Sequence, residues 1–312
     1  MKLGFVANLV RFMIQKVIPN TDKIDIMIIG AQKAGTTSLK NYLGEHPELQ
    51  THPQKEFGYF WDDDEFNHGF EKAKKKYFSG NSSSKKKVAK NAILFNSEKG
   101  LLRLREHNPD CRIILSLRNP VERTYSAYQM EHNYGSLKSD FSEMKDVIDN
   151  PLPSNIDWRY DFLIGMSLYH KHIAALWEIF PKEQVSIVLY DELRDNPKTL
   201  LKNLYAACAV STSFIPDLSK KYNVTQKVQS HLYSRLVRRL LRNNNPVKKM
   251  AQFVLPDNSN YKVGDALRNI NKSKNSPDEM TAEMRTFLIE YFKPFNAELQ
   301  KLIGHDLSNW NH

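Results

Sequence analysis

The chain has 312 residues, of which 41% are hydrophobic and 26% charged; this composition is ordinary for a soluble globular protein with a core. The formal net charge of +10 favours anionic partners, namely nucleotides, anionic glycans, nucleic acids or membrane surfaces, and does not choose among them. The two cysteines, Cys111 and Cys208, exclude a disulfide framework and have no metal-ligand spacing. We therefore expect two buried free thiols in a reducing compartment.

The first stretch of the chain, residues 1–18, has apolar residues at helical spacing. Arg11 and Lys16 interrupt the apolar run, which is too short to span a bilayer and lacks a clear small-residue cleavage site. We expect an N-terminal amphipathic helix over residues 1–20. It either packs on the domain, which we favour, or lies on a membrane surface.

A strand, a tight loop and a helix start follow at residues 24–43. Residues 24–29 are nearly all apolar, as is typical of a buried parallel strand, and Gly30 to Gly35 form a loop of small residues before a predicted helix. Such a unit binds anions because backbone N–H groups converge at the helix N-terminus, where the helix dipole adds partial positive charge. A Walker A loop has a lysine directly after its second glycine. Here Thr36 takes that place, and the lysine, Lys33, lies inside the loop.

The rest of the chain continues the alternation of strands and helices. Strands are predicted over residues 48–50, 111–117 and 184–189, and helices over residues 94–107, 121–132, 165–180, 197–209 and 279–303. The polar stretch 72–87 is predicted to be a surface loop. We therefore expect an α/β fold with a central parallel β-sheet flanked by helices, in a single domain over residues 21–312.

Two segments resemble the sulfotransferases that use 3'-phosphoadenosine 5'-phosphosulfate (PAPS). GAQKAGTTSL, residues 30–39, resembles their 5'-phosphosulfate loop, and RNPVERTYSAYQMEH, residues 118–132, resembles their 3'-phosphate site. The closest likeness is to the carbohydrate branch, the heparan sulfate sulfotransferase type and its bacterial relatives. The resemblance covers nearly the whole chain in patches and implies a fold like that of P-loop nucleoside-triphosphate hydrolases. The residues that it assigns to the cofactor are Lys33, Ala34, Gly35, Thr36, Thr37, Ser38, Arg118 and Ser126, with Lys272 and Lys274 in a later basic loop.

Elementary chemistry agrees with the assignment of the second phosphate site. An arginine can fork onto a phosphate, and Ser126, eight residues after Arg118, lies about two turns along the predicted helix. Taken singly, Arg118 would instead be interpreted as part of a salt bridge and Ser126 as a helix-surface serine.

The candidate general base comes from residues 54–60, QKEFGYF, which resemble the KE-x-x-F-F segment of the carbohydrate sulfotransferases. The resemblance assigns the role to Glu56, because an acceptor hydroxyl or amine loses its proton as it attacks sulfur. A carboxylate desolvated beside aromatic residues suits that task, whereas the ordinary alternative is a surface Lys–Glu pair. Since other branches use histidine, His46 and His52 are reserve candidates.

Three lysines complete the predicted site. Lys33 would stabilise the charge that builds on the leaving oxygen. Lys55 and Lys90 are candidate acceptor-binding residues; Lys90 stands where relatives have a Gly-Glu-Lys-Ser/Thr-Pro segment, of which this chain keeps only the lysine, so a surface lysine is an equal alternative. No ligand cluster for a metal is seen, and none is expected.

Residues 228–249 form a markedly basic segment. Either Leu232, Leu236 and Leu240 pack inward beneath a solvated helix face, or the segment binds an anionic glycan acceptor or a membrane surface. A nucleic-acid partner is not expected, because no recognition module accompanies the charge.

The sequence thus predicts a PAPS-dependent sulfotransferase that transfers the sulfuryl group to a hydroxyl or amino group of a carbohydrate or glycolipid acceptor, releasing adenosine 3',5'-bisphosphate. Two alternatives are kept. A P-loop kinase of a small molecule is disfavoured by the missing lysine after Gly35, and a non-catalytic anion- or glycan-binding module would share the scaffold. The acceptor and the oligomeric state are not fixed by the sequence. Because the first strand begins so early, we expect a cytoplasmic protein with peripheral membrane contact through residues 1–18 or 228–249.

Overall fold

The computed structural model of the chain describes residues 23–78, 85–137, 141–153, 156–220, 228–240, 266–271, 273 and 279–312. The predicted helix over residues 1–20 lies outside them, as do Lys272 and Lys274. The chain divides into two compact units, and each is described by itself. Among the described residues, the first unit holds 23–30, 35–116 and 176–220, and the second holds 31–34, 117–175 and those after 220. The predicted single domain over residues 21–312 stays a prediction.

The first unit is built on a five-stranded sheet with the order β2-β3-β1-β4-β5. Its strands are β1 (Ile26–Gly30), β2 (Leu49–Thr51), β3 (Lys86–Lys90), β4 (Arg112–Leu117) and β5 (Val185–Leu189). The pairs β1–β3, β1–β4 and β2–β3 are parallel. All five residues of β1 are buried, which confirms the buried parallel strand predicted from its apolar run.

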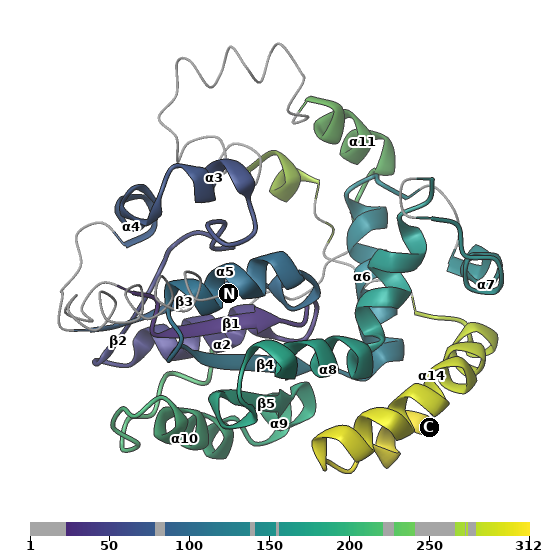
Figure 1. The fold of residues 1–312 in the computed structure, drawn as a ribbon. Coiled ribbons are helices and arrows are strands. Elements are labelled where there is room, and N and C mark those ends of the chain that lie inside the picture. Colours follow the sequence, from purple (N-terminus) through teal and green to yellow (C-terminus); the bar gives the residue numbers. More distant parts are fainter. Residues whose placement is uncertain are drawn as a thin grey trace, which may run out of the picture. The chain divides into compact units, whose positions relative to one another are not determined.

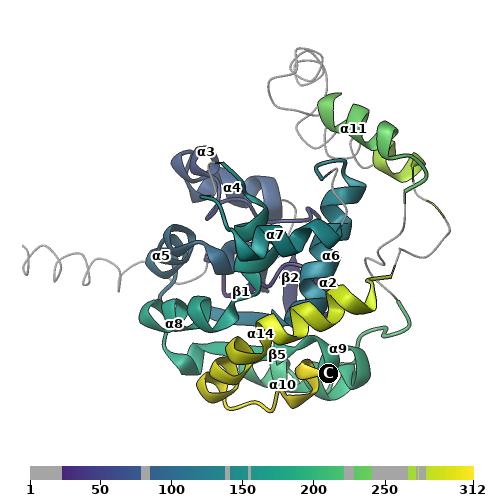
Figure 2. The same cartoon turned by 90° about the vertical axis from the view of Figure 1, so that its right-hand side faces the viewer.

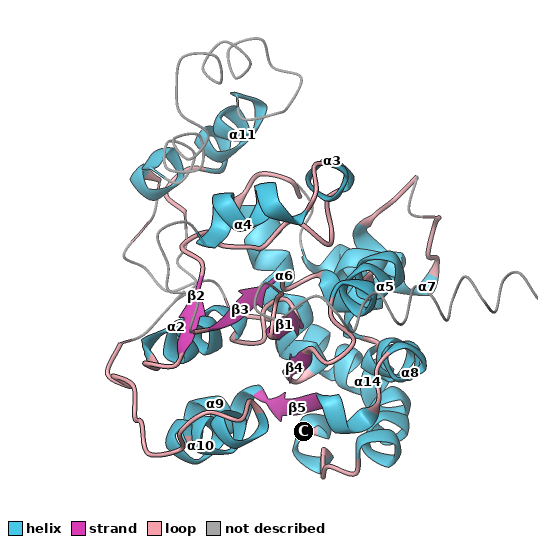
Figure 3. Cartoon of the chain, turned by 60° about the vertical axis from the view of Figure 1, so that its left-hand side comes forward, coloured by secondary structure: helices cyan, strands magenta, loops and turns pink. Residues whose placement is uncertain are grey.

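Helices cover both faces of this sheet (Figures 1 and 3). They are α2 (Thr36–Glu45), α3 (Asp63–Asn67), α4 (Phe70–Phe78), α5 (Glu98–His107), α9 (Tyr190–Asp195) and α10 (Pro197–Ala207), with short turns η1 (Leu94–Asn96) and η5 (Lys182–Gln184). Figure 3 shows α2 and α10 on one side of the sheet and α5 on the other. The helix predicted over residues 94–107 is divided at Ser97, whose hydroxyl accepts a hydrogen bond from the backbone of Gly100 and thereby caps α5.

The prediction of a surface loop over residues 72–87 is wrong at both ends of this range. Helix α4 continues to Phe78, and strand β3 begins at Lys86 in the interior of the sheet. The lysines of β3 made this strand look polar, but Lys87 and Lys90 are buried, and the ammonium groups of Lys86 and Lys90 have oxygen partners. The ammonium of Lys86, for example, donates to the backbone carbonyls of Cys208 and Ala209 at 2.8 and 3.0 Å.

The second unit is mainly helical (Figure 2). Its elements are α6 (Pro120–Asn133), η2 (Phe141–Glu143), α7 (Met144–Asp149), the π-helical turn η3 (Tyr160–Ile164), η4 (Gly165–Ser167), α8 (Tyr169–Ile179), α11 (His231–Leu240), α14 (Ala282–Ile303) and η6 (Ser308–Asn311). Helix α8 runs from the second unit into the first. Helix α14 packs against α6, and an apolar cluster that includes Val121, Leu163, Leu288 and Phe292 forms the core.

Helix α11 contradicts one of the two alternatives for residues 228–249. Leu232, Leu236 and Leu240 do not pack inward: they are 66%, 54% and 46% exposed, whereas Ser234 and Val237 of the same helix are buried.

None of the described helices combines the length and the apolar composition needed to cross a membrane.

Candidate functional site

The N-terminus of α2 has the geometry of an anion site in the first unit. Gly35 caps the helix with φ of 78°, and no described side chain caps it further. A Cβ on Gly35 would lie 2.9 Å from side-chain atoms of Leu193 and Tyr190, so both the conformation and the space require glycine. The N–H groups of the first helical turn have no intrahelical partners, and this leaves donors for a ligand.

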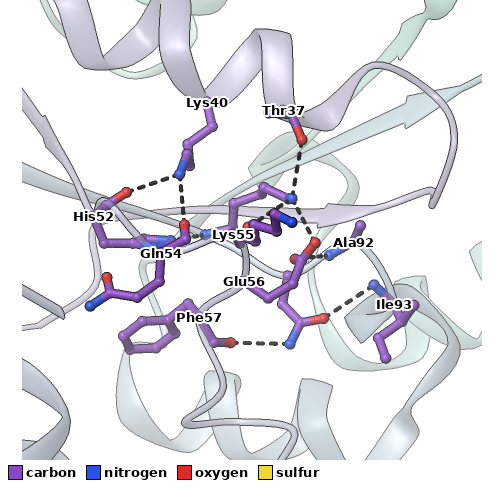
Figure 4. A network of polar contacts seen from close by, with 11 residues as sticks. Thr37, Lys40, His52, Gln54, Lys55, Glu56, Phe57, Ala92 and Ile93 are labelled. Atoms are coloured by element: carbon purple, nitrogen blue, oxygen red, sulfur yellow. Dashed lines mark hydrogen bonds and ion pairs between the residues drawn. The ribbon is translucent and has the colours of Figure 1, made fainter. Parts of the chain in front are cut away.

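A buried ammonium group links this helix start to the candidate base. The Lys90 ammonium lies 2.7 Å from Oε1 of Glu56, 2.9 Å from the backbone carbonyl of Lys55 and 3.4 Å from the hydroxyl of Thr37 (Figure 4). The other carboxylate oxygen of Glu56 accepts from the backbone N–H of Ala92 at 2.8 Å. Thr37, Lys55, Glu56 and Lys90, all named by the sequence, therefore meet in one network.

Two details of that network differ from expectation. The Lys90 side chain is 3% exposed, so its alternative interpretation as a surface lysine is wrong. The Glu56 side chain is 44% exposed, so it is not desolvated beside aromatic residues as predicted. Its position is fixed instead by the charge of Lys90 and by the backbone donor.

Lys40 is a buried residue that the sequence analysis missed. Its ammonium donates to the backbone carbonyls of His52 and Gln54 at 2.9 and 2.8 Å, and this ties the segment before Glu56 to α2 (Figure 4). Burial, followed by the charge of Lys90, lowers the pKa of Lys40 to about 8. Its position on the same face of α2 as Leu39 and Leu43 was the signal available in the sequence.

The two reserve histidines have structural contacts. Nε2 of His52 accepts from the backbone N–H of Lys90 at 3.2 Å, and burial, with the charges of Lys40 and Lys90, lowers the pKa of His52 to about 3. Nε2 of His46 lies 2.9 Å from the carbonyl oxygen of Ser211, and its Nδ1 accepts from a backbone N–H. Both rings thus hold neighbouring backbone in place.

In the second unit the loop over residues 31–34 carries Lys33 in the left-handed region, with φ of 72°. A non-glycine residue there is strained by about 1 kcal/mol, and Arg118 supports it by donating to the carbonyl of Lys33 at 3.3 Å. Burial, followed by the charges of Arg118 and Arg123 and opposed by Glu131, lowers the pKa of Lys33 to about 8. The loop is therefore surrounded by an excess of positive charge.

Arg123 is the second residue that the sequence analysis missed. It is fully buried, and it donates to the carbonyl of Gln32 at 3.2 Å and to those of Phe162 and Leu163 at 2.8 and 2.9 Å. Burial lowers the pKa of Arg123 to about 10, which still leaves it charged at neutral pH. These bonds fasten the lysine-bearing loop to η3. In the sequence, Arg123 looks like an ordinary arginine on a helix surface.

The two residues predicted for the 3'-phosphate are Arg118, just before α6, and Ser126, within this helix. Arg118 directly follows β4, and its backbone carbonyl accepts from the Tyr169 hydroxyl at 3.0 Å. Ser126 is buried on α6, as predicted for a position along that helix. The carboxylate of Glu122 lies 3.5 Å from Arg118 and 2.6 Å from Arg285, so it competes for the arginine that the prediction gives to the phosphate.

Over the described ranges, the structure shows no group of three or more His, Cys, Asp or Glu side chains that could hold a metal ion. Cys111 and Cys208 are buried free thiols, as predicted.

Comparisons with known proteins show the family to which the chain belongs. Residues 23–301 match the family model described as a sulfotransferase domain. Mouse bifunctional heparan sulfate N-deacetylase/N-sulfotransferase 1 is 27% identical over 299 residues, which cover 91% of this chain and 30% of that protein. Human bifunctional heparan sulfate N-deacetylase/N-sulfotransferase 3 is 24% identical over 296 residues, with the same two shares. The chain thus spans about 30% of the length of these relatives.

The fold itself is matched by a solved structure. The crystal structure of a sulfotransferase from Alicyclobacillus acidocaldarius superposes with a TM-score of 0.62 at 22% identity, covering 92% of this chain and 98% of that one. This likeness confirms the predicted α/β fold. Since the family model spans most of the sequence, the chain belongs to the sulfotransferase domain family.

Proposed function

We propose that this protein transfers the sulfuryl group from PAPS to a hydroxyl or amino group of a carbohydrate-type acceptor and releases adenosine 3',5'-bisphosphate. The observation that carries the proposal is the network around Lys90, which joins Glu56 to Thr37 in the first turn of α2 (Figure 4). A proton acceptor is thereby held close to a helix N-terminus that suits an anionic donor.

The roles in the transfer are those that the family resemblance implies, and the chemistry of each group agrees with them. Glu56 accepts the proton of the acceptor hydroxyl or amine as its oxygen or nitrogen attacks sulfur. The bond from sulfur to the bridging oxygen breaks, its electron pair stays on that oxygen, and Lys33 stabilises the charge that develops there. Lys90 orients the carboxylate, while the 44% exposure of the Glu56 side chain leaves it open to an acceptor.

Donor binding draws on the cations of the second unit. Arg118 holds Lys33, and burial together with the neighbouring positive charges lowers the pKa of Lys33, so an anion placed there would stabilise the ammonium form. We assign the 3'-phosphate to Arg118 and Ser126, and the 5'-phosphosulfate to residues 33–38. Lys272 and Lys274 stay predicted cofactor contacts.

The acceptor class is supported by the relatives, whose names describe heparan sulfate N-sulfotransferases. We propose a glycan or glycolipid acceptor, with the exposed Lys55 as a contact for an anionic sugar and Lys90 as a contact nearer the reacting group. Cytoplasmic localisation, with peripheral membrane contact through residues 1–18 or 228–249, is part of the same proposal.

A transfer assay tests the proposal. PAPS labelled with radioactive sulfate is incubated with a panel of glycan, glycolipid and small-alcohol acceptors, using wild type, Glu56→Gln and Glu45→Gln. Glu45 is a matched control because it also accepts from a lysine ammonium, that of Lys220, and from a backbone N–H. We expect Glu56→Gln to lower kcat by about 10²- to 10⁴-fold with unchanged nucleotide affinity, and Glu45→Gln to behave as wild type. Equal kcat values in the two variants would refute the role of Glu56.

Calorimetry separates the alternatives. Tight binding of ATP without binding of adenosine 3',5'-bisphosphate would favour a small-molecule kinase. Binding of the bisphosphate without transfer to any acceptor would favour a non-catalytic binding module on the same scaffold.

A further inference from the structure

Helix α11 carries an apolar stripe that faces solvent. Leu232, Leu236 and Leu240 follow one another at intervals of four residues, so they lie along one side of the helix. All three are exposed, and Ile270, in the neighbouring described stretch, is 68% exposed. Aligned apolar side chains of this size on a soluble surface indicate an interaction site rather than chance exposure.

Contacts on the other side of α11 fix the direction of the stripe. A Cβ on Gly135 would lie 2.9 Å from the backbone nitrogen of Arg235, so the helix approaches the end of α6 closely. Asn271 donates to the Ser234 hydroxyl at 2.8 Å and to the Ser230 carbonyl at 2.7 Å. Val237 is buried. The leucines therefore point outward because the opposite face of the helix is already occupied.

The same surface is basic. Arg235, Arg238 and Arg239 are exposed on α11. In a helical projection Arg235 and Arg239 lie beside the leucines, whereas Arg238 lies farther round the helix, next to the buried Ser234. The described stretches 228–240 and 266–271 contain no aspartate or glutamate. The exposed part of α11 thus combines one apolar stripe with one kind of charge.

We propose that α11 binds the surface of an anionic lipid bilayer, with its leucines at the boundary between head groups and acyl chains and its arginines on the lipid phosphates. A second copy of the chain is disfavoured because a symmetric contact would bring like charges together. A glycan is disfavoured because it would leave the leucines without apolar partners. This inference does not depend on the proposed sulfuryl transfer.

Vesicle flotation tests the proposal with the full chain. Vesicles of phosphatidylcholine alone are compared with an equal mixture of phosphatidylcholine and phosphatidylglycerol. We expect wild type to float with the mixed vesicles and to stay behind with the neutral ones. The double variant Leu232→Ser/Leu236→Ser should bind the mixed vesicles roughly tenfold more weakly or worse. Leu102→Ser is the matched control, because Leu102 is a leucine on α5 with 50% exposure.

The charge is tested separately. Arg235→Gln/Arg239→Gln should weaken binding to the mixed vesicles by about fivefold per arginine and should flatten its salt dependence. Unchanged far-UV circular dichroism and an unchanged midpoint of urea unfolding show that each variant is folded. The proposal is overturned if wild type ignores mixed vesicles or if the leucine variant floats like Leu102→Ser. It is also overturned if light scattering shows a dimer that the leucine variant converts to a monomer.

Discussion

The titration of Lys33 gives the sharpest test of the donor site. In the free protein, burial and the neighbouring Arg118 and Arg123 lower the pKa of Lys33 to about 8, with Glu131 opposing them. An anion bound at the loop adds negative charge beside the ammonium and raises that pKa. Binding therefore takes up a proton, and affinity is full below pH about 8 and declines above it.

The expected magnitude follows from this pKa. With a pKa of about 8, roughly nine tenths of Lys33 is protonated at pH 7 and roughly one tenth at pH 9. If the bound form stays protonated, affinity for adenosine 3',5'-bisphosphate falls about tenfold between these pH values, or about 1.4 kcal/mol. The phosphates of the ligand do not obscure the effect, because their second protons leave near pH ~6.

Calorimetric titration with adenosine 3',5'-bisphosphate at pH 7, 8 and 9 measures this dependence, and repetition in buffers of different ionisation enthalpy counts the proton taken up. Lys33→Arg is the matched control, since arginine keeps its charge over the whole range and should give a flat profile. Lys40→Met removes a second lysine whose pKa is about 8 and should leave the slope in place. The reasoning fails if wild type is as flat as Lys33→Arg, or if Lys40→Met removes the slope.

Three further predictions concern stability and affinity. The pKa of His52 falls from 6.5 to about 3 on folding, so between these pH values the unfolded chain binds more protons than the folded one. Urea unfolding should therefore show that the free energy of unfolding falls by about 2 kcal/mol from pH 7.5 to pH 5, and the fall should be smaller in His52→Gln. Gly69 has φ of 83° and open space around it, so Gly69→Ala should lower the free energy of unfolding by about 1 kcal/mol. Gly35→Ala should lower it by about 1–3 kcal/mol more, because the added Cβ would also clash, and equal losses in urea unfolding would contradict this. Glu122→Gln should raise calorimetric affinity for adenosine 3',5'-bisphosphate roughly 2- to 5-fold by freeing Arg118, and should leave that for adenosine 5'-phosphate unchanged.

The sequence was sufficient wherever a local pattern determines a local structure. The buried strand β1, the glycine loop and the helix over residues 121–132 could be predicted, because apolar runs, glycine turns and helical spacing depend on residues near in sequence. The family resemblance supplied the roles of Lys33 and Glu56, which no periodicity could have given.

The sequence did not reveal which charged side chains are buried, because their hydrogen-bond partners lie far away in the chain. Strand β3 was missed because Lys86 and Lys90 looked solvent-exposed. Their ammonium groups in fact donate to groups far away in the sequence, Lys86 to backbone carbonyls and Lys90 to a carboxylate. Lys40 and Arg123 were missed for the same reason. Conversely, the leucines of α11 follow a core-like period and yet point outward, since Asn271 and Gly135 occupy the other face of that helix.

The buried cations share a bonding pattern that has a consequence for anion binding. In the first unit Lys40 donates to two backbone carbonyls, and in the second Arg123 donates to three, with no carboxylate partner for either among the described residues. A carboxylate would satisfy the same donors but would cancel the charge, whereas a carbonyl fixes the side chain and leaves its positive charge in place. Burying such charge costs stability, as the lowered pKa values of Lys40 and Arg123 indicate. Each of these cations therefore keeps its charge in the folded protein, and an anionic ligand bound near one of them would recover part of that cost.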